Sequence, residues 1–165
     1  LSNTKEGRGY GGEIAAGWQC FSWLHLALTY AYQRLDLEDR GSQGFSLSGL
    51  DDKEDNDDFA SINHPRHQAS LRSTINFAEG WQFNWWLRYV DAIEGRNNLD
   101  QTSNIPVDAY FLVDANLIWR PQKNLEVMLA GQNLTNSRQL EYIAELITPA
   151  TEIERSVYLK VTWCF

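Results

Sequence analysis

The chain ends in a stretch, residues 155–165, that alternates between apolar and other side chains. From Val157 onward every second residue is apolar, and the series ends in Trp163 and the terminal Phe165. A period of two indicates a β-strand with one apolar face and one mixed face. A water-soluble protein gains little from an exposed terminal phenylalanine, whereas a strand that faces lipid uses aromatic side chains at the membrane boundary. This end of the chain therefore predicts a strand with lipid on one side.

Six further stretches repeat the alternation, at about the length of a tilted membrane strand. In the clearest of them, apolar residues from Leu24 to Tyr32 alternate with polar or small ones. The predicted strands are residues 10–19, 24–34, 67–77, 81–90, 110–119, 125–133 and 156–165. The sequence therefore predicts an all-β, antiparallel fold of about seven strands.

The connections between these strands alternate in length. Short turns are expected at 20–23, 78–80 and 120–124, and long loops at 35–66, 91–109 and 134–154. Outer-membrane barrels have short periplasmic turns and longer extracellular loops. The rhythm therefore favours an up-and-down transmembrane β-barrel whose C-terminus is periplasmic. Alternation alone would also allow a soluble β-sandwich.

Composition agrees with a membrane barrel that has a polar interior. Aromatic residues make up 13% of the 165 residues, mean hydropathy is −0.45, and no apolar run is long enough for a transmembrane helix. The net charge is −8, and residues 36–58, with nine acids and two bases, carry −7 of it. We expect a solvated acidic loop there, with a weak capacity to concentrate divalent cations. The absence of a basic patch in the sequence argues against nucleic-acid binding.

Four stretches resemble the C-terminal part of the barrel of TonB-dependent outer-membrane receptors. Residues 9–32 resemble a strand–turn–strand unit in which a G-x-E segment precedes W-L-x-L and Tyr-x-Tyr, here Tyr30 and Tyr32. Residues 65–71 resemble a P-x-H strand opening, residues 131–136 an x-N-L-x-(D/N) segment, and residues 155–165 the terminal strand. The four stretches follow the family's order and cover nearly the whole chain.

The resemblance implies a bacterial outer-membrane protein with a plugged barrel of about 22 strands. Such receptors import scarce nutrients, most often ferric siderophores, haem or cobalamin. The inner-membrane protein TonB supplies the energy by pulling on a short N-terminal box. Neither a plug nor a TonB box is recognised in residues 1–165. We therefore expect the chain to be the C-terminal part of such a barrel, whose full-length parent binds TonB and an iron complex such as a ferric siderophore.

Two sets of candidate site residues follow. The resemblance implies that the terminal strand is an assembly signal, in which Tyr158, Val161, Trp163 and Phe165 engage the barrel-assembly machinery by strand pairing. Polar residues on the other faces are expected to line the lumen. These candidates are Arg72, Trp86, Arg88, Asp114, Asn116, Glu126 and Lys160. Trp86 is unusual there as an aromatic residue, and a plug or a loop would be expected to cover it.

No catalytic, cofactor or metal site is predicted. Ser70 and Ser156 have no nearby histidine in the pattern, and His64 and His67 beside the acidic run are weak metal ligands by themselves. Two alternatives stay open, an outer-membrane barrel that hydrolyses lipids and a soluble β-sandwich binding module. Seven strands in a meander leave two open edges, which lipid does not tolerate. We therefore expect the chain by itself to self-associate.

Overall fold

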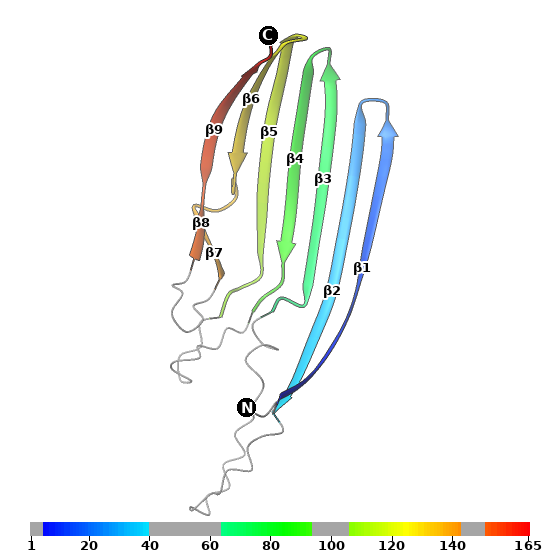
Figure 1. Ribbon diagram of the computed structural model, residues 1–165, viewed down its shortest axis with the longest axis vertical. Helices are drawn as coiled ribbons and strands as arrows, with labels where there is room; N and C mark the ends of the chain where they lie inside the picture. The colour runs from blue at the N-terminus through cyan, green and yellow to red at the C-terminus, as the bar shows by residue number, and fades with distance from the viewer. Residues whose placement is uncertain (1–4, 40–63, 94–105, 143–150) are drawn as a thin grey trace, which may run out of the picture.

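The computed structural model describes residues 5–39, 64–93, 106–142 and 151–165 (Figure 1). In these ranges no helix is long and apolar enough to cross a membrane. The strands are β1 (Lys5–Phe21), β2 (Leu24–Asp39), β3 (His67–Ala78), β4 (Trp81–Val90), β5 (Tyr110–Gln122), β6 (Leu125–Gln132), β7 (Arg138–Tyr142), β8 (Thr151–Glu154) and β9 (Ser156–Trp163).

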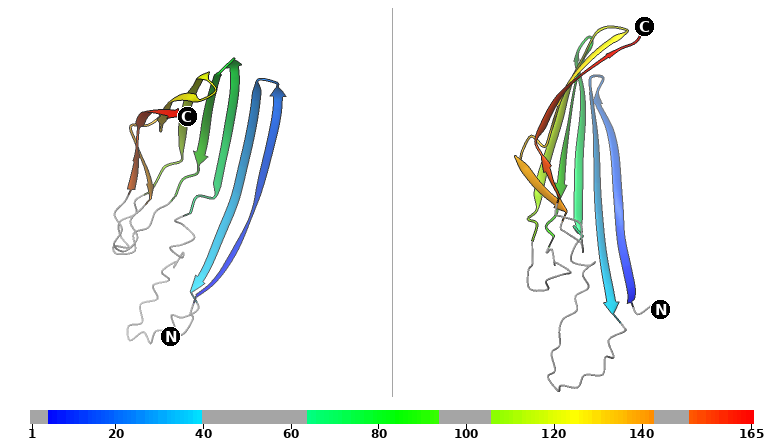
Figure 2. Two further views of the ribbon diagram at one scale, coloured as in Figure 1. Left: turned by 45° about the horizontal axis from the view of Figure 1, so that its top comes forward. Right: turned by 60° about the vertical axis from the view of Figure 1, so that its left-hand side comes forward.

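Seven of these strands form one antiparallel sheet. Their order is β1-β2-β3-β4-β5-β6-β9, and β7 and β8 pair with each other as a separate hairpin. Each strand of the sheet runs antiparallel to its neighbours. The sheet is curved and stays open, with β1 and β9 at its two edges (Figure 2). The predicted all-β, antiparallel up-and-down fold with seven main strands is confirmed.

The three tight turns lie at the same end of the sheet as the C-terminus (Figure 1). They are Ser22–Trp23, Glu79–Gly80 and Lys123–Asn124. The strand register shifts just before each turn, and bulges of this kind are common at the rims of barrels because they increase the local twist. Gly80 has a φ of 72°, and a Cβ there would lie 2.6 Å from the backbone oxygen of Arg120. Only glycine fits that turn without strain.

The strand ends differ from the prediction at the opposite end of the sheet. β1 begins at Lys5 instead of residue 10, and β2 continues to Asp39, where a loop was expected. Lys5 and Asp39 are register partners, so the two strands pair beyond their apolar stretch. Backbone hydrogen bonds need no apolar face, and hydrophobic alternation therefore underestimates such strands.

The loop predicted for 134–154 is wrong in part, because β7 and β8 form a hairpin within it. The guanidinium of Arg138 on β7 lies 3.9 Å from Glu152 and 3.4 Å from Glu154 on β8. The strands of this hairpin have only five and four residues, so the alternation in them is too short to be recognised. The acidic run at 51–58 and most of the loop at 91–109 lie outside the described residues.

The sheet has an apolar face and a polar face. Side chains alternate between the faces along each strand, and the register aligns them in rows across the strands. The apolar face carries, for example, the row Leu28, Leu71, Leu87 and Val113. No described element covers this face, and Leu129 and Leu159 remain 49% and 65% exposed. A β-sandwich needs a second sheet at that place, so the sandwich alternative is wrong.

Candidate functional site

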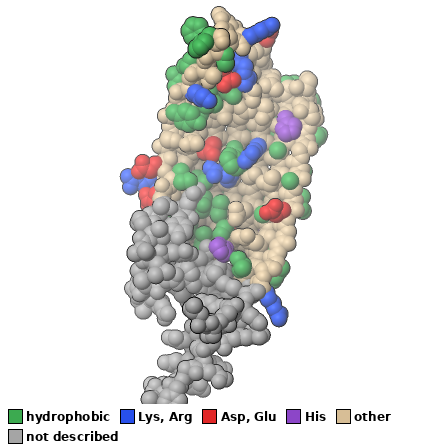
Figure 3. Space-filling view, in the orientation of Figure 1, with side chains coloured by type: hydrophobic (Ala, Val, Ile, Leu, Met, Phe, Trp, Pro, Cys, Tyr) green, Lys and Arg blue, Asp and Glu red, His purple; other side chains and the backbone are tan. Residues whose placement is uncertain are grey.

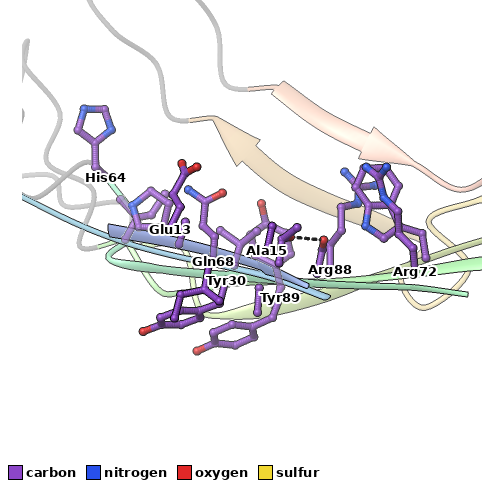
Figure 4. A pocket seen from close by; sticks show the side chains of 18 residues that line it. Glu13, Ala15, Tyr30, His64, Gln68, Arg72, Arg88 and Tyr89 are labelled. Carbon is purple, nitrogen blue, oxygen red and sulfur yellow. Dashed lines mark hydrogen bonds between the residues drawn. The ribbon is translucent and has the colours of Figure 1, made fainter. Parts of the chain in front are cut away.

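A hollow of about 730 Å³ lies over the polar face, where β1 to β4 form its wall. Glu13, Arg72 and Arg88 project from one side of the sheet into this space, whereas Tyr30 and Tyr89 point to the other side (Figure 4). In the space-filling view, acidic and basic side chains gather near the middle of the sheet (Figure 3). The alternation along the strands therefore brings charged groups together on the concave side.

The centre of the polar face holds four of the predicted residues in contact, which we call the arginine cluster. Arg72 on β3, Trp86 on β4 and Asp114 on β5 form one row across three strands. The guanidinium carbons of Arg72 and Arg88 lie 4.0 and 4.4 Å from the centroid of the Trp86 ring. Arg88 Nη2 donates to Asp114 Oδ2 at 2.8 Å. The cluster is thus two cations stacked on one indole, with one carboxylate beside them.

A second group of polar residues, here called the polar ladder, crosses β4, β5 and β6 closer to the tight turns. Arg120 Nε donates to Glu126 Oε2 at 2.9 Å, and its Nη1 donates to Gln82 Oε1 at 3.1 Å. Gln82 Nε2 donates to Asn84 Oδ1 at 2.9 Å, and Asn84 Nδ2 donates to Asn116 Oδ1 at 2.7 Å. Cross-strand pairs of this kind stabilise a sheet. Asn116 and Glu126 were predicted candidates, whereas the sequence placed Arg120 in a turn and missed its role.

Lys160 on β9 lies apart from both groups. Its register partner is Met128 on β6, and Met128 pairs in register with Ile118 on β5. The structure therefore separates the seven predicted residues into a cluster of four, two members of the ladder, and one exposed lysine at the edge strand.

Asn133, at the end of β6, connects the arginine cluster to the β7–β8 hairpin. Its φ of 49° lies in the left-handed region, and the residue is 1% exposed. Its backbone N–H donates to Asp114 Oδ1 at 2.9 Å, and its Nδ2 donates to the backbone oxygen of Ile153 on β8 at 2.8 Å. Asparagine tolerates this backbone conformation better than most residues. The sequence flagged residues 131–136 as a family segment, but the alternation alone assigned Asn133 to a strand.

The terminal strand presents the predicted assembly residues on both faces of an open edge. Val161 and Trp163 lie on the apolar face and are 60% and 68% exposed. Tyr158 pairs in register with Ala130 on the polar side, and Phe165 lies beyond the end of β9. The β9 edge away from β6 pairs with no other described strand.

Comparison with known proteins shows where this sheet occurs. Residues 1–134 match the family described as TonB dependent receptor-like, beta-barrel, and no curated protein matched the sequence. The siderophore receptor PiuA from Acinetobacter baumannii is similar, with a TM-score of 0.74 and 24% identity over 96% of this chain and 22% of that chain. The ferric-catecholate import receptor Fiu from E. coli K12, in its closed form, has a TM-score of 0.73 and 19% identity over 96% of this chain and 21% of that chain.

An open antiparallel sheet with one apolar and one polar face defines part of the wall of a β-barrel. Because the family match covers most of the sequence, the chain belongs to the TonB-dependent receptor β-barrel family, and the predicted resemblance is confirmed. The structural similarity, at identities below 25%, shows the fold. The chain spans about a fifth of the length of PiuA and Fiu.

Neither serine that could act as a nucleophile lies against a base. Ser70 Oγ and Thr29 Oγ1 share a hydrogen bond of 2.6 Å, and Ser156 Oγ donates to Gln132 Oε1 at 3.2 Å. His67 Nδ1 is bonded to a tyrosine hydroxyl at 2.7 Å. Within the described ranges, no three His, Cys, Asp or Glu side chains could hold a metal ion together. These contacts give the lipid-hydrolase alternative no support. The family that the sequence matches is described as receptor-like.

The Asn133 junction gives a prediction about stability. Asn133→Ala should lower the free energy of unfolding by about 2–3 kcal/mol, because it leaves the Ile153 carbonyl unpaired and places alanine in the left-handed region. Asn133→Gly should recover about 1 kcal/mol of this loss, because glycine relieves the backbone but restores no hydrogen bond. Denaturant titration of the protein in lipid or detergent measures both values. Equal losses in the two variants would contradict the role of the backbone angle.

Proposed function

We propose that the chain forms part of the transmembrane wall of a bacterial outer-membrane receptor that imports an iron complex, such as a ferric siderophore. The observation that carries this proposal is the uncovered apolar face of a single sheet. In water such a face would be a large exposed patch, whereas hydrocarbon covers it without a second protein layer. The polar face, with the arginine cluster and the polar ladder, then faces the interior.

Aromatic pairs at both ends of the apolar face support membrane insertion. Trp81 and Trp119 stack at 5.5 Å near the tight turns, and Tyr89 and Phe111 pack at 5.0 Å near the long connections. Trp81 and Tyr89 both lie on β4, and eight residues of strand span about 26 Å. A tilt of about 40° shortens this to about 20 Å, close to the apolar band of about 25 Å in outer-membrane barrels. The pairs therefore fit the two aromatic girdles of such a barrel.

The nature of the cargo is inferred from the similar structures. PiuA is a siderophore receptor, and Fiu is a ferric-catecholate import receptor. Membership of the same barrel family supports uptake of an iron complex by the protein that contains this chain. In that protein, residues 1–165 would be the C-terminal part of the barrel, and a plug with a TonB box would lie elsewhere in the sequence.

The terminal strand supports a role in assembly. β9 has one free edge, and strand addition to such an edge is a common mode of recognition. Tyr158, Val161, Trp163 and Phe165 would carry the contact with the barrel-assembly machinery, and all four side chains are exposed. Self-association of the isolated chain, through the edges at β1 and β9, stays a prediction.

Lipid contact can be tested with two neighbouring residues of β6. Leu129 lies on the apolar face and Met128 on the polar face. Leu129→Arg should lower the stability of the inserted receptor by about 2–4 kcal/mol, because the charge enters hydrocarbon. Met128→Arg, the matched control, should cost much less, since its face is hydrated. Denaturant titration in lipid vesicles measures the difference, and similar losses in both variants would contradict the assignment of the faces.

The assembly role gives a second prediction. Phe165→Ala should reduce the amount of folded receptor in the outer membrane several-fold, because the terminal aromatic no longer anchors strand addition. Cys164→Ala is the matched control, since it changes the preceding exposed residue. Heat-modifiable mobility in gels of outer-membrane fractions measures the folded amount. The proposal fails if both variants assemble as the unchanged receptor does.

Iron uptake tests the function itself. Cells that lack the receptor should lose most accumulation of radioactive iron supplied as a ferric catecholate siderophore, and the receptor gene should restore it. Loss of TonB should have the same effect, because import against a gradient needs its energy. Uptake of ferrous iron serves as the control and should not change. Unchanged accumulation with every siderophore class tested would exclude iron-complex import.

A further inference from the structure

We propose that Arg72, Trp86 and Arg88 form a binding site for an oxyanion, above all a carboxylate, on the polar face. The inference rests on the proposed function in one respect, because it takes this face to be the inner wall of the receptor. The occupant would be either a soluble anion that enters the hollow or an acidic side chain from another segment of the same receptor. Both present the same chemistry to the wall.

The first argument is the charge balance of the cluster. The one carboxylate in it, Asp114, uses both oxygens: Oδ2 accepts from Arg88, and Oδ1 accepts from the backbone of Asn133. Arg72 contacts Trp86 but forms no ion pair or hydrogen bond with the residues that the structure describes. The cluster therefore keeps a net charge of about +1, with Arg72 exposed and with the side chains of Arg88 and Asp114 29% and 19% exposed.

The acid that lines the hollow, Glu13, is too far away to neutralise this charge. Glu13 lies on β1, in a row with Ala31 and Gln68, whereas the row of Arg72 contains Ala27. Four residues along β3 and two strands across the sheet separate the rows, a distance of about 16 Å. Over that separation an ion pair is largely screened.

The second argument is the geometry of the donors. The two guanidinium carbons lie 4.0 and 4.4 Å from one ring centroid, so both cations contact the same indole. A guanidinium that stacks through its face keeps the N–H groups in its own plane free. A carboxylate can accept hydrogen bonds from two of these N–H groups. Arg88 Nε and Trp86 Nε1 are buried donors without a partner among the described residues. A third charged group of opposite sign would reduce the repulsion and accept hydrogen bonds.

The hollow provides the space for such a group. Its volume of about 730 Å³ is enough for a small organic anion or for the end of an acidic side chain. Arg72, Trp86 and Arg88 all line it, and Figure 4 shows Arg72 and Arg88 on the same side of the sheet. The strands hold these side chains on a continuous ladder, so the site is preorganised rather than formed by loops.

The first arm of the test is an anion titration of the intact receptor. Citrate, a soluble tricarboxylate, is added at constant ionic strength, and the thermal unfolding midpoint is followed. If the occupant is a soluble anion, the midpoint should rise saturably, and Arg72→Gln should weaken the apparent affinity by at least tenfold. Lys160→Gln, which removes a cation of the same face outside the cluster, should leave the response unchanged. A response that persists in Arg72→Gln would overturn the proposal.

The second arm distinguishes an internal carboxylate, which would already fill the site and make the receptor insensitive to citrate. In that case Arg72→Glu should unfold at a lower temperature than Arg72→Gln, because the new acid faces another acid. If citrate has no effect and Arg72→Glu is as stable as Arg72→Gln or more stable, the new acid pairs with Arg88 in an empty site, and the proposal is wrong. Thermal unfolding needs no transport, so a receptor can fail this test and still import iron.

Discussion

The antiparallel backbone ladder is the interaction on which the rest of this structure depends. In hydrocarbon every peptide group must find a hydrogen-bond partner within the protein. Each strand between β1 and β9 in the sheet has a neighbouring strand on both sides. The ladder holds the strands without a packed core, so few of the described residues are buried. Apolar side chains can therefore occupy one face of the sheet and polar side chains the other. The alternation of apolar and polar residues follows from this division, rather than from the needs of a protein interior.

The polar face uses the same ladder to place charges with accuracy. Register alone sets Arg72, Trp86 and Asp114 in one row, although 14 and 28 positions separate them in the sequence. A ladder cannot slip by one residue without exchanging the two faces, so the row is fixed as firmly as the apolar face. The arginine cluster is therefore a consequence of pairing, and its charge balance depends on which single carboxylate the register brings beside it.

Sequence predicted the strands in which apolar and polar residues alternate regularly. Strands such as β4, with Trp81, Phe83 and Trp85 on one side, alternate so regularly that their bounds were found from the pattern alone. It failed where the strands extend past the regular alternation or are short: β1 and β2 pair as far as Lys5 and Asp39, and β7 and β8 pair with Arg138 opposite Glu154. The candidate site shows the same limit. Alternation selected the face of Arg72 and Arg88, but no pattern indicates that they share one indole or that Arg120 bridges two strands.

Asp114 connects the arginine cluster to the backbone at the end of β6. One of its oxygens balances Arg88, and the other holds the backbone of Asn133, where β6 ends and the chain turns toward the β7–β8 hairpin. Asn133 in turn holds β8 through the carbonyl of Ile153. A carboxylate with two such partners resists movement more than one that pairs with a single cation, because each contact orients the group for the other. The wall and the hairpin are thus linked through one side chain, and a change in charge at the cluster acts on the backbone that supports the hairpin.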